Sequence, residues 1–284
     1  MARARHLMRQ GVTTLEIKSG YGMDVGTELT MLQAARGVGE SLPLTVKTTL
    51  LALHALPPEF DGRRDDFLTL ALEQLLPRAV QEGLVDAVDA FCEGIAFTPE
   101  ECAAFFQAAT DLQLPVRLHA DQLSDTGGAA LAARFSALSA DHLEYTSEEG
   151  VRAMAKAGMV AVLLPGAFYY LRETRPPPVA SLREHGVPMA LATDANPGSS
   201  PILSLLTILN MGCTLYRLTP EEALAGVTTN AARALGLGSE VGTLEPGKRA
   251  DLAVWDVNHP RQLAYWLGTN PCRAMIKGGL LVDI

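Results

Sequence analysis

The fold is decided by three stretches of the chain: P-V-R-L-H-A-D-Q (residues 115–122), A-L-S-A-D-H-L-E-Y (residues 137–145) and V-P-M-A-L-A-T-D-A-N-P-G (residues 187–198). In each stretch a short apolar run stops at a polar residue: His119, His142 or Asp194. A buried parallel strand that presents a functional group at its carboxyl end has this pattern. Two imidazoles and a carboxylate that meet at one mouth of a sheet can hold a divalent metal and move protons around it. The three stretches therefore predict a metallohydrolase.

The same alternation of apolar runs and helical stretches extends over most of the chain. The expected strands cover residues 12–18, 44–53, 87–92, 115–119, 137–142, 159–164 and 187–193. The expected helices cover residues 26–40, 65–82, 98–112, 125–135, 147–157 and 178–185. Strands that alternate with helices form a parallel sheet with right-handed crossovers, and a closed barrel of this kind needs eight strands. We therefore expect an α/β fold, a (β/α)8 TIM-like barrel in which strands 2–8 are visible and the first strand is missing.

The pattern changes after the seventh expected strand. Two longer helices are predicted over residues 201–216 and 220–235, followed by a turn-rich segment. A half-exposed strand is then expected in R-A-D-L-A-V-W-D-V (residues 249–257), and a hairpin with Gly278 and Gly279 at its turn. We predict a catalytic barrel domain over residues 1–235, and over residues 236–284 the C-terminal part of a small β domain.

Composition limits the kinds of partner that are expected. The 284 residues suit an α/β barrel, which takes about 250 residues, and a hydrophobic content of 48% excludes a disordered chain. A net charge of −9 argues against nucleic acid and anionic membranes as partners. Four cysteines without C-x-x-C spacing indicate reduced thiols, and no apolar run reaches the roughly 20 residues of a membrane span. We expect a cytoplasmic protein with a small-molecule substrate and leave a homodimer open.

Further polar residues stand at the ends of other expected strands. His54 closes the second run and Tyr21 lies in a glycine-flanked loop after the first, so both suit substrate contacts. Glu93 ends the third run, where it can support the site or anchor a loop. Asp194 ends an apolar strand, where a carboxylate without a partner is costly, so we predict a metal ligand there.

Neighbouring residues are expected to support the two strand-end histidines. His142 lies between Asp141 and Glu144, either of which could orient its ring and fix its tautomer. Asp121 and Gln122 follow His119 and are expected to face the same cavity.

Seven motifs together resemble the imidazolonepropionase family of the amidohydrolase superfamily. They are E-I-K-S-G-Y-G (16–22), H-A-L-P-P-E (54–59), L-H-A-D-Q (118–122), S-A-D-H-L-E-Y (139–145), L-L-P-G-A-F-Y (163–169), A-T-D-A-N-P-G (192–198) and G-T-L-E-P-G-K-R-A-D-L (242–252). The resemblance implies a deformed barrel with a small β domain and one Zn or Fe ion. The reaction that it implies is hydrolysis of 4-imidazolone-5-propanoate to N-formimidoyl-L-glutamate in histidine breakdown.

The resemblance also implies roles for individual residues. His119 and Asp194 match metal ligands, and His142, with Asp194 the expected catalytic pair, matches a histidine near the reacting carbonyl. The positions that match substrate contacts are Tyr21, His54, Gln122, Asn196, Gly198 and Ser199. The family's H-x-H metal motif and an arginine that binds the substrate's carboxylate are absent from this sequence. Both losses agree with a missing N-terminal part that includes the first strand.

Three alternatives remain open at this point. Another amidohydrolase, such as a ring deaminase or a cyclic amidase, would keep the metal residues and differ in its substrate contacts. A metal-free barrel lyase would need a lysine near a strand end, for which Lys18 and Lys47 are the candidates. A truncated, non-catalytic fragment is the third.

Overall fold

The computed structural model describes residues 1–283, whose contacts divide the chain into two compact units. The 16–159 unit consists of Glu16–Ser41 and Val46–Met159. The 160–283 unit consists of the residues from Val160 onward together with Met1–Leu15 and Leu42–Thr45. All seven expected strands are present, and their order in the seven-stranded sheet is the order of the chain, β1 to β7. The prediction of seven successive strands is therefore confirmed.

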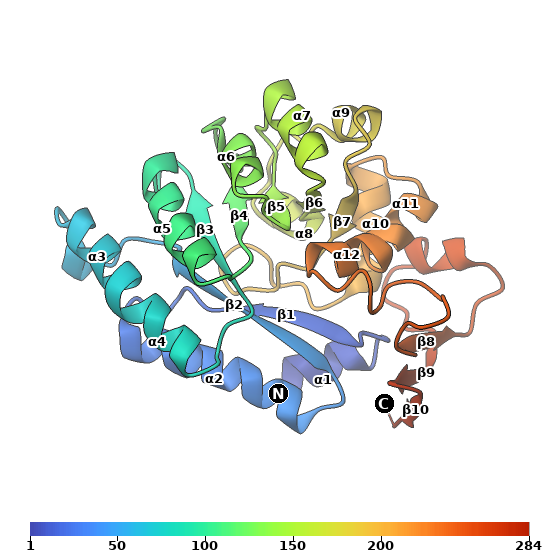
Figure 1. The fold of residues 1–284 in the computed structure, drawn as a ribbon. Helices are drawn as coiled ribbons and strands as arrows, with labels where there is room; N and C mark the ends of the chain where they lie inside the picture. Colours follow the sequence, from blue (N-terminus) through green and yellow to red (C-terminus); the bar gives the residue numbers. More distant parts are fainter. Residues whose placement is uncertain (284) are drawn as a thin grey trace. The chain divides into compact units, whose positions relative to one another are not determined.

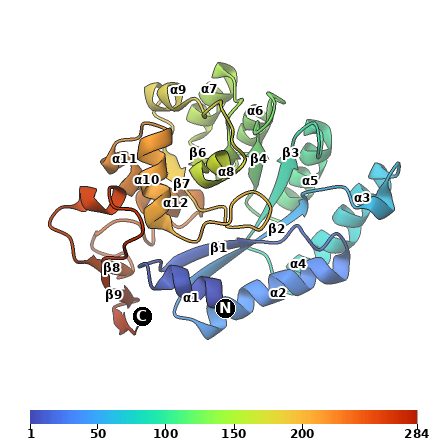
Figure 2. The same cartoon turned by 180° about the vertical axis from the view of Figure 1, so that it is seen from behind.

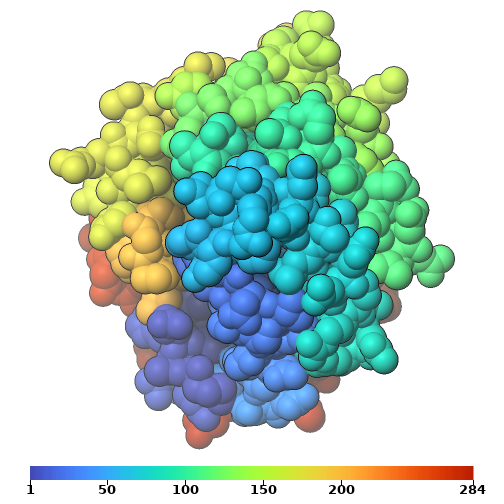
Figure 3. Space-filling view, turned by 90° about the vertical axis from the view of Figure 1, so that its left-hand side faces the viewer, coloured from blue at the N-terminus to red at the C-terminus, as the bar shows by residue number. Residues whose placement is uncertain are grey.

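Five strands and half of the α-helices belong to the 16–159 unit, with the first residues of β1 and β2 counted in the other unit. The strands are β1 (Thr14–Lys18), β2 (Thr45–Leu53), β3 (Ala87–Cys92), β4 (Arg117–Ala120) and β5 (Ser139–His142). The helical elements are α2 (Val25–Ser41), η1 (Pro58–Phe60), α3 (Arg64–Leu70), η2 (Ala71–Leu75), α4 (Leu76–Gln81), α5 (Pro99–Asp111), α6 (Gly128–Arg134) and α7 (Glu148–Ala157). Helix α5 packs against β3 and α6 against β4 (Figure 1), and α2 contacts η2; Figure 2 shows α2 next to α4, the helix that follows η2. Figure 3 shows the outer surface that α3 to α5 form, in cyan and green.

The register of β3, β4 and β5 decides which side chains share a face. These strands pair in parallel, with Phe91 opposite His119 and His119 opposite Asp141. Because side chains alternate between the two faces of a strand, Asp89, two residues before Phe91, lies on the same face as His119. One face of this sheet segment therefore carries charged and imidazole side chains next to one another.

Local sequence signals explain where the helices of this unit begin. Thr98 and Glu101 form a reciprocal capping box at the start of α5, and Ser147 caps α7. The expected helix over residues 65–82 is found as α3, the π-helical turn η2 and α4 in succession. The irregular turn precedes Pro77, because a proline inside a helix has no N–H to donate and its ring crowds the preceding turn.

The 160–283 unit combines two parallel strands, several short helices and a small antiparallel sheet. Its elements are α1 (Ala2–Met8), β6 (Val160–Leu163), α8 (Pro165–Tyr170), α9 (Val179–Glu184), β7 (Met189–Leu191), α10 (Leu205–Leu215), α11 (Pro220–Gly226), α12 (Thr229–Ala234), β8 (Leu252–Trp255), η3 (Pro260–Ala264), β9 (Cys272–Lys277) and β10 (Leu280–Val282). Strands β8, β9 and β10 form the expected sheet. Its hairpin turns at Gly278 and Gly279, whose φ angles of 57° and 85° suit glycine.

One expectation for this unit needs correction, and one helix was not expected. The single helix predicted over residues 220–235 is two helices, because the chain leaves helical geometry at Thr228 (φ −124°, ψ −93°). There the Thr228 hydroxyl donates a hydrogen bond to the carbonyl of Leu224. Helix α8 is not anticipated by the sequence pattern, although Pro165 at its first turn is a usual start signal. The proposed domains 1–235 and 236–284 stay a prediction. No helix in residues 1–283 is long and apolar enough to cross a membrane.

The packing of α7 leads to a prediction about stability. Met154 is 0% exposed, whereas Lys156 on the same helix is exposed. Replacing Met154 by Ala leaves a cavity and should lower the free energy of unfolding by about 2–5 kcal/mol. Replacing Lys156 by Ala, the matched control, should change it by less than about 0.5 kcal/mol. Urea denaturation measures both, and equal effects of the two replacements would show that α7 does not pack as described.

Candidate active site

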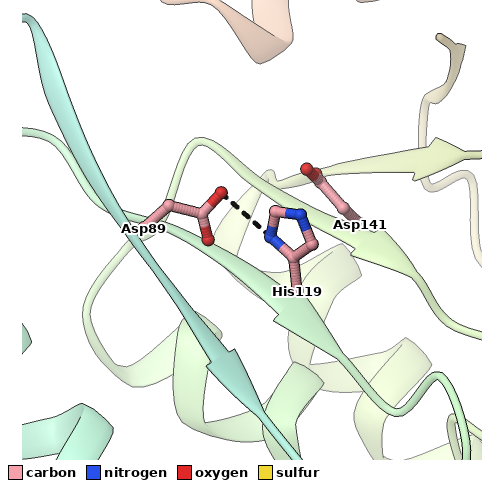
Figure 4. A group of neighbouring side chains, drawn as sticks. All are labelled: Asp89, His119 and Asp141. Carbon is pink, nitrogen blue, oxygen red and sulfur yellow. Dashed lines mark ion pairs between the residues drawn. The ribbon is translucent and has the colours of Figure 1, made fainter. Parts of the chain in front are cut away.

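Lys18 binds two buried carboxylates at the centre of the 16–159 unit. Its ammonium lies 2.5 Å from Asp89 Oδ2 and 2.9 Å from Asp141 Oδ2. The same Asp89 oxygen is 3.0 Å from His119 Nδ1. Figure 4 shows Asp89 and Asp141 on either side of the His119 ring, each on its own strand. The lysine and histidine thus share one carboxylate oxygen.

Two more charges extend this arrangement along β1 and β4. Glu16 binds the Arg117 guanidinium and accepts a hydrogen bond of 2.6 Å from the Thr49 hydroxyl. We call Glu16, Lys18, Asp89, Arg117 and Asp141 the inner charge network. It holds three carboxylates and two cations, so with a neutral His119 it keeps one negative charge. Such a charge favours a cation beside the imidazole.

The network sets the protonation of its members. Burial works to raise the pKa of Asp89, but the positive charge of His119 in its protonated form and that of Lys18 outweigh it and hold this pKa far below its usual range. Burial likewise works to lower the pKa of Lys18, yet Asp141 and Asp89 raise it. A lysine that stays protonated between two carboxylates cannot attack a carbonyl, which argues against the lyase alternative.

The geometry leaves one nitrogen of His119 for a ligand. An ionised carboxylate only accepts hydrogen bonds, so the 3.0 Å contact with Asp89 favours a proton on Nδ1, which would leave the lone pair on Nε2. Metal-bound histidines in proteins usually have this arrangement. Burial works to lower the pKa of His119, and the Asp89 carboxylate outweighs it and raises this pKa. A raised pKa favours the imidazolium, which cannot ligate, so it is the neutral ring, with an Nε2 that Asp89 does not contact, that fits the predicted role of metal ligand.

Asp89, His119 and Asp141 form a group that could hold a metal ion by itself, since one ligand atom from each lies within 4.8 Å of the others. The Lys18 ammonium, however, already contacts both carboxylates. We therefore interpret Lys18 as the cation of these two carboxylates, and His119 Nε2 as the donor that remains.

Four of the predicted site residues form a row of rings in this unit. The ring centroids of Tyr21 and His54 are 4.9 Å apart, and those of His119 and His142 are 5.5 Å apart. Phe91 lies between the two pairs, with its centroid 6.2 Å from both His54 and His119. Tyr21 is 50% exposed, whereas the other predicted ring residues are more buried. The structure thus brings the predicted substrate-contact rings next to the predicted metal ligand.

His142 ends β5 in a strained backbone conformation. Its φ of 77° lies in the left-handed region, and its side chain is buried. Burial and the charge of His119 hold the pKa of His142 well below the ordinary value, so the ring is neutral. Within residues 1–283 its Nδ1 has no hydrogen-bond partner. The expectation that Asp141 orients this ring is wrong, because Asp141 binds Lys18 and Ser139 instead.

Two acidic residues organise the loop after β4. Glu93 accepts hydrogen bonds from the backbone N–H groups of Leu123 (2.7 Å) and Ser124 (3.0 Å), so its loop-anchoring role is confirmed. Asp121 was expected to face the cavity, but it accepts bonds from the first N–H groups of α6 and from the Thr146 hydroxyl. Gln122, the predicted substrate contact between them, is buried.

The other predicted residues, Asp194, Asn196, Gly198 and Ser199, lie in the 160–283 unit on the loop after β7. The Asn196 Oδ1 accepts the backbone N–H groups of Gly198 (2.8 Å) and Ser199 (2.7 Å). Its amide nitrogen donates to the Asp194 carbonyl at 2.7 Å. Asn196 therefore fixes the loop that carries Asp194, and the binding roles of these four residues stay predictions.

Sequence reasoning missed Asp89 and the partners of Lys18. A signal was present, because the Asp in A-V-D-A-F-C stands inside an apolar strand, where a charge without a partner is costly. The two charged residues of T-L-E-I-K in β1 likewise indicate charges that need partners inside the sheet. The strand pattern shows that such charges need partners but does not show which strands supply them.

Comparisons with known proteins identify the family of this chain. Residues 4–281 match the Amidohydrolase family. The chain is 59% identical over 281 residues to an imidazolonepropionase of Ruegeria pomeroyi and 60% identical over 282 residues to one of Paracoccus denitrificans. Each alignment covers 99% of this chain and 70% of the relative, so the chain spans about 70% of their length.

Solved structures of low identity share the fold. A triazine hydrolase variant superposes with a TM-score of 0.79 at 18% identity, covering 99% of this chain and 70% of that one. An adenosine deaminase from Xanthomonas campestris with bound zinc gives 0.71 at 18% identity, covering 99% and 68%. The predicted barrel fold of the metal-dependent hydrolase type is confirmed.

The loop anchored by Glu93 provides a test of the site's architecture. Glu93→Ala removes the acceptor of two backbone N–H groups, so hydrogen exchange of residues 121–126 should become faster. The free energy of unfolding should fall by about 1–3 kcal/mol. Glu93→Gln keeps one acceptor oxygen and should show a smaller effect. Unchanged exchange in the Ala variant would contradict the anchoring role.

Proposed function

This chain belongs to the imidazolonepropionase family of the amidohydrolases, and we propose that it hydrolyses the ring C–N bond of 4-imidazolone-5-propanoate to give N-formimidoyl-L-glutamate in histidine degradation. The observation that carries the proposal is the buried pair of His119 and Asp89, which leaves Nε2 of His119 as a ligand beside the ring row. Identities of 59–60% to imidazolonepropionases over nearly the whole chain support the substrate.

We propose one Zn or Fe ion as the cofactor, with His119 and Asp194 as its ligands from this chain. A bound divalent ion would supply a water with a pKa of about 7, which is the nucleophile that opening a ring amide at neutral pH requires. None of the six histidines in the sequence forms an H-x-H pair. With two protein ligands the ion is expected to bind weakly, so assays need added metal.

The remaining steps rest on side chains of this chain. Asp194 takes the proton of the attacking water and returns it to the leaving ring nitrogen. His142 is buried and neutral, so it can donate a hydrogen bond to the developing oxyanion or accept a proton from the water. We propose that Tyr21 and His54 hold the propionate tail. The groups proposed to contact the planar ring are Gln122, Asn196, Gly198 and Ser199.

We infer a cytoplasmic enzyme that acts on a small molecule, without nucleic-acid or membrane partners. The net charge of −9 and four free cysteines support this inference. A homodimer is compatible with it.

The direct test is turnover of imidazolonepropionate by the purified chain with excess Zn²⁺ or Fe²⁺. We expect loss of the substrate and formation of formimidoylglutamate, detected by mass spectrometry, and no reaction with chelator present. A chain that binds metal but acts on a different cyclic amide would favour another amidohydrolase. A chain that hydrolyses neither imidazolonepropionate nor another cyclic amide would be a non-catalytic fragment. Either of these two outcomes would contradict the proposal.

Asp194→Asn tests the proton-transfer role. The amide keeps the side-chain shape but loses the charge and most of its basicity, so turnover should fall about 10²–10⁴-fold. Asp65→Asn, an exposed aspartate on α3, is the control and should keep full turnover. Metal content is measured alongside. An Asp194→Asn variant with near-normal turnover would exclude the assigned mechanism.

Tyr21→Phe tests the substrate contact. It removes one hydroxyl and keeps the ring that contacts His54. The variant should lose roughly 1–3 kcal/mol of substrate binding, seen as a higher KM with little change in kcat. An unchanged KM would remove Tyr21 from the substrate site while leaving the metal chemistry in place.

A further inference from the structure

His119 and His142 end neighbouring strands and differ in what lies at their Nδ1 atoms. The Asp89 carboxylate lies 3.0 Å from Nδ1 of His119, within ion-pair distance but outside regular hydrogen-bond geometry, whereas Nδ1 of His142 has neither an ion pair nor a hydrogen bond within the described chain. We propose that Asp89 and Lys18 are positioning residues for His119: Asp89 fixes its tautomer and ring orientation, and Lys18 holds Asp89 in place. This inference rests on the proposed role of His119 as a metal ligand.

Asp89 is fixed from three sides. It is 0% exposed, and its Oδ1 accepts the backbone N–H of Ala90 at 2.8 Å. Its Oδ2 is bound by Lys18 Nζ at 2.5 Å and lies 3.0 Å from His119 Nδ1. A carboxylate with both oxygens engaged has little freedom to rotate, so the position of its oxygens fixes the direction of the imidazole ring.

Lys18 connects the strands on both sides of His119. Its ammonium contacts Asp89 on β3 and Asp141 on β5, and His119 lies on β4 between them. Asp141 is also the cross-strand neighbour of His119 in the register of β4 and β5. The lysine therefore acts as a fixed cross-link inside this part of the sheet. Its ammonium is the counter-ion of both carboxylates.

The tautomer matters because only one ring nitrogen can ligate. With the proton on Nδ1, the Nε2 lone pair is available to a metal ion. With the proton on Nε2, it is not. Without Asp89 nothing in the inner charge network would select between the two forms. The carboxylate thus acts through His119 and does not touch the substrate.

Imidazole NMR tests the inference directly, without substrate or metal. The chain is labelled with ¹⁵N-histidine and its long-range ¹H–¹⁵N spectrum is recorded, free of metal, at rising pH until the His119 ring is neutral, because Asp89 raises the pKa of this ring. We expect His119 in the Nδ1–H form. An Nε2–H form in the unmodified protein would overturn the proposal, whatever the variants do.

Variants then separate positioning from general stability. Asp89→Asn replaces the carboxylate by an amide that can accept or donate, so the tautomer preference of His119 should be lost and Zn²⁺ affinity should fall about 10–100-fold, measured by chelator competition. Lys18→Met should act in the same direction, and Lys18→Arg, which keeps the charge, should partly restore the Nδ1–H form. A normal tautomer and affinity in both Asp89→Asn and Lys18→Met would overturn the proposal.

Asp86→Asn is the matched control. Asp86 precedes β3 and binds Arg36 at 2.7 Å, so it is an ion-paired aspartate outside the inner charge network. This variant should lower stability but leave the His119 tautomer unchanged, and a changed tautomer would show that any destabilisation suffices. Because these readouts need no substrate, a failure to hydrolyse imidazolonepropionate leaves this inference standing. A failed tautomer test removes the argument from the His119–Asp89 pair, and the proposed reaction then rests on the identities to imidazolonepropionases and is decided by the turnover assay.

Discussion

The ion pairs of Lys18 with Asp89 and Asp141 are the interaction on which the arrangement of the 16–159 unit depends. Burying charges is costly unless they are paired, and removing one partner of a buried pair leaves an uncompensated charge. The pairs form only when β3, β4 and β5 have the register that is observed, because a slip by one residue would turn every side chain to the opposite face. The network therefore specifies the register as well as the environment of His119.

This electrostatic arrangement gives similar side chains different properties. The Asp89 carboxylate raises the pKa of His119, whereas burial and the charge of His119 lower the pKa of His142 and of His54. One histidine is thus oriented by a carboxylate and two are held neutral by their surroundings. A site that needs a ligand, a neutral hydrogen-bonding group and a substrate contact can obtain all three from one residue type.

Much of the fold follows from the sequence, because apolar runs that end at polar residues identify buried parallel strands. Helix starts also follow from the sequence. Thr98 is followed by a proline and two acidic residues, and Ser147 by two acidic residues, and each of them caps a helix. What the sequence does not reveal is pairing between distant strands. The sequence shows that Asp89 stands in an apolar strand, where a charge needs a partner. It does not show that the partner is Lys18, which lies 71 residues away. Asp121 illustrates the opposite error, since a polar residue beside a site can serve a helix terminus instead.

The most direct measurement of the central claim is anomalous X-ray diffraction from crystals of the chain loaded with Zn²⁺. If Asp89 directs His119 and Lys18 is the cation of the carboxylate pair, the zinc peak should lie about 2.0–2.1 Å from His119 Nε2, with Lys18 still between Asp89 and Asp141. A zinc ion bound to Asp89 and Asp141 with Lys18 displaced, or one bound to His119 Nδ1, would contradict the account.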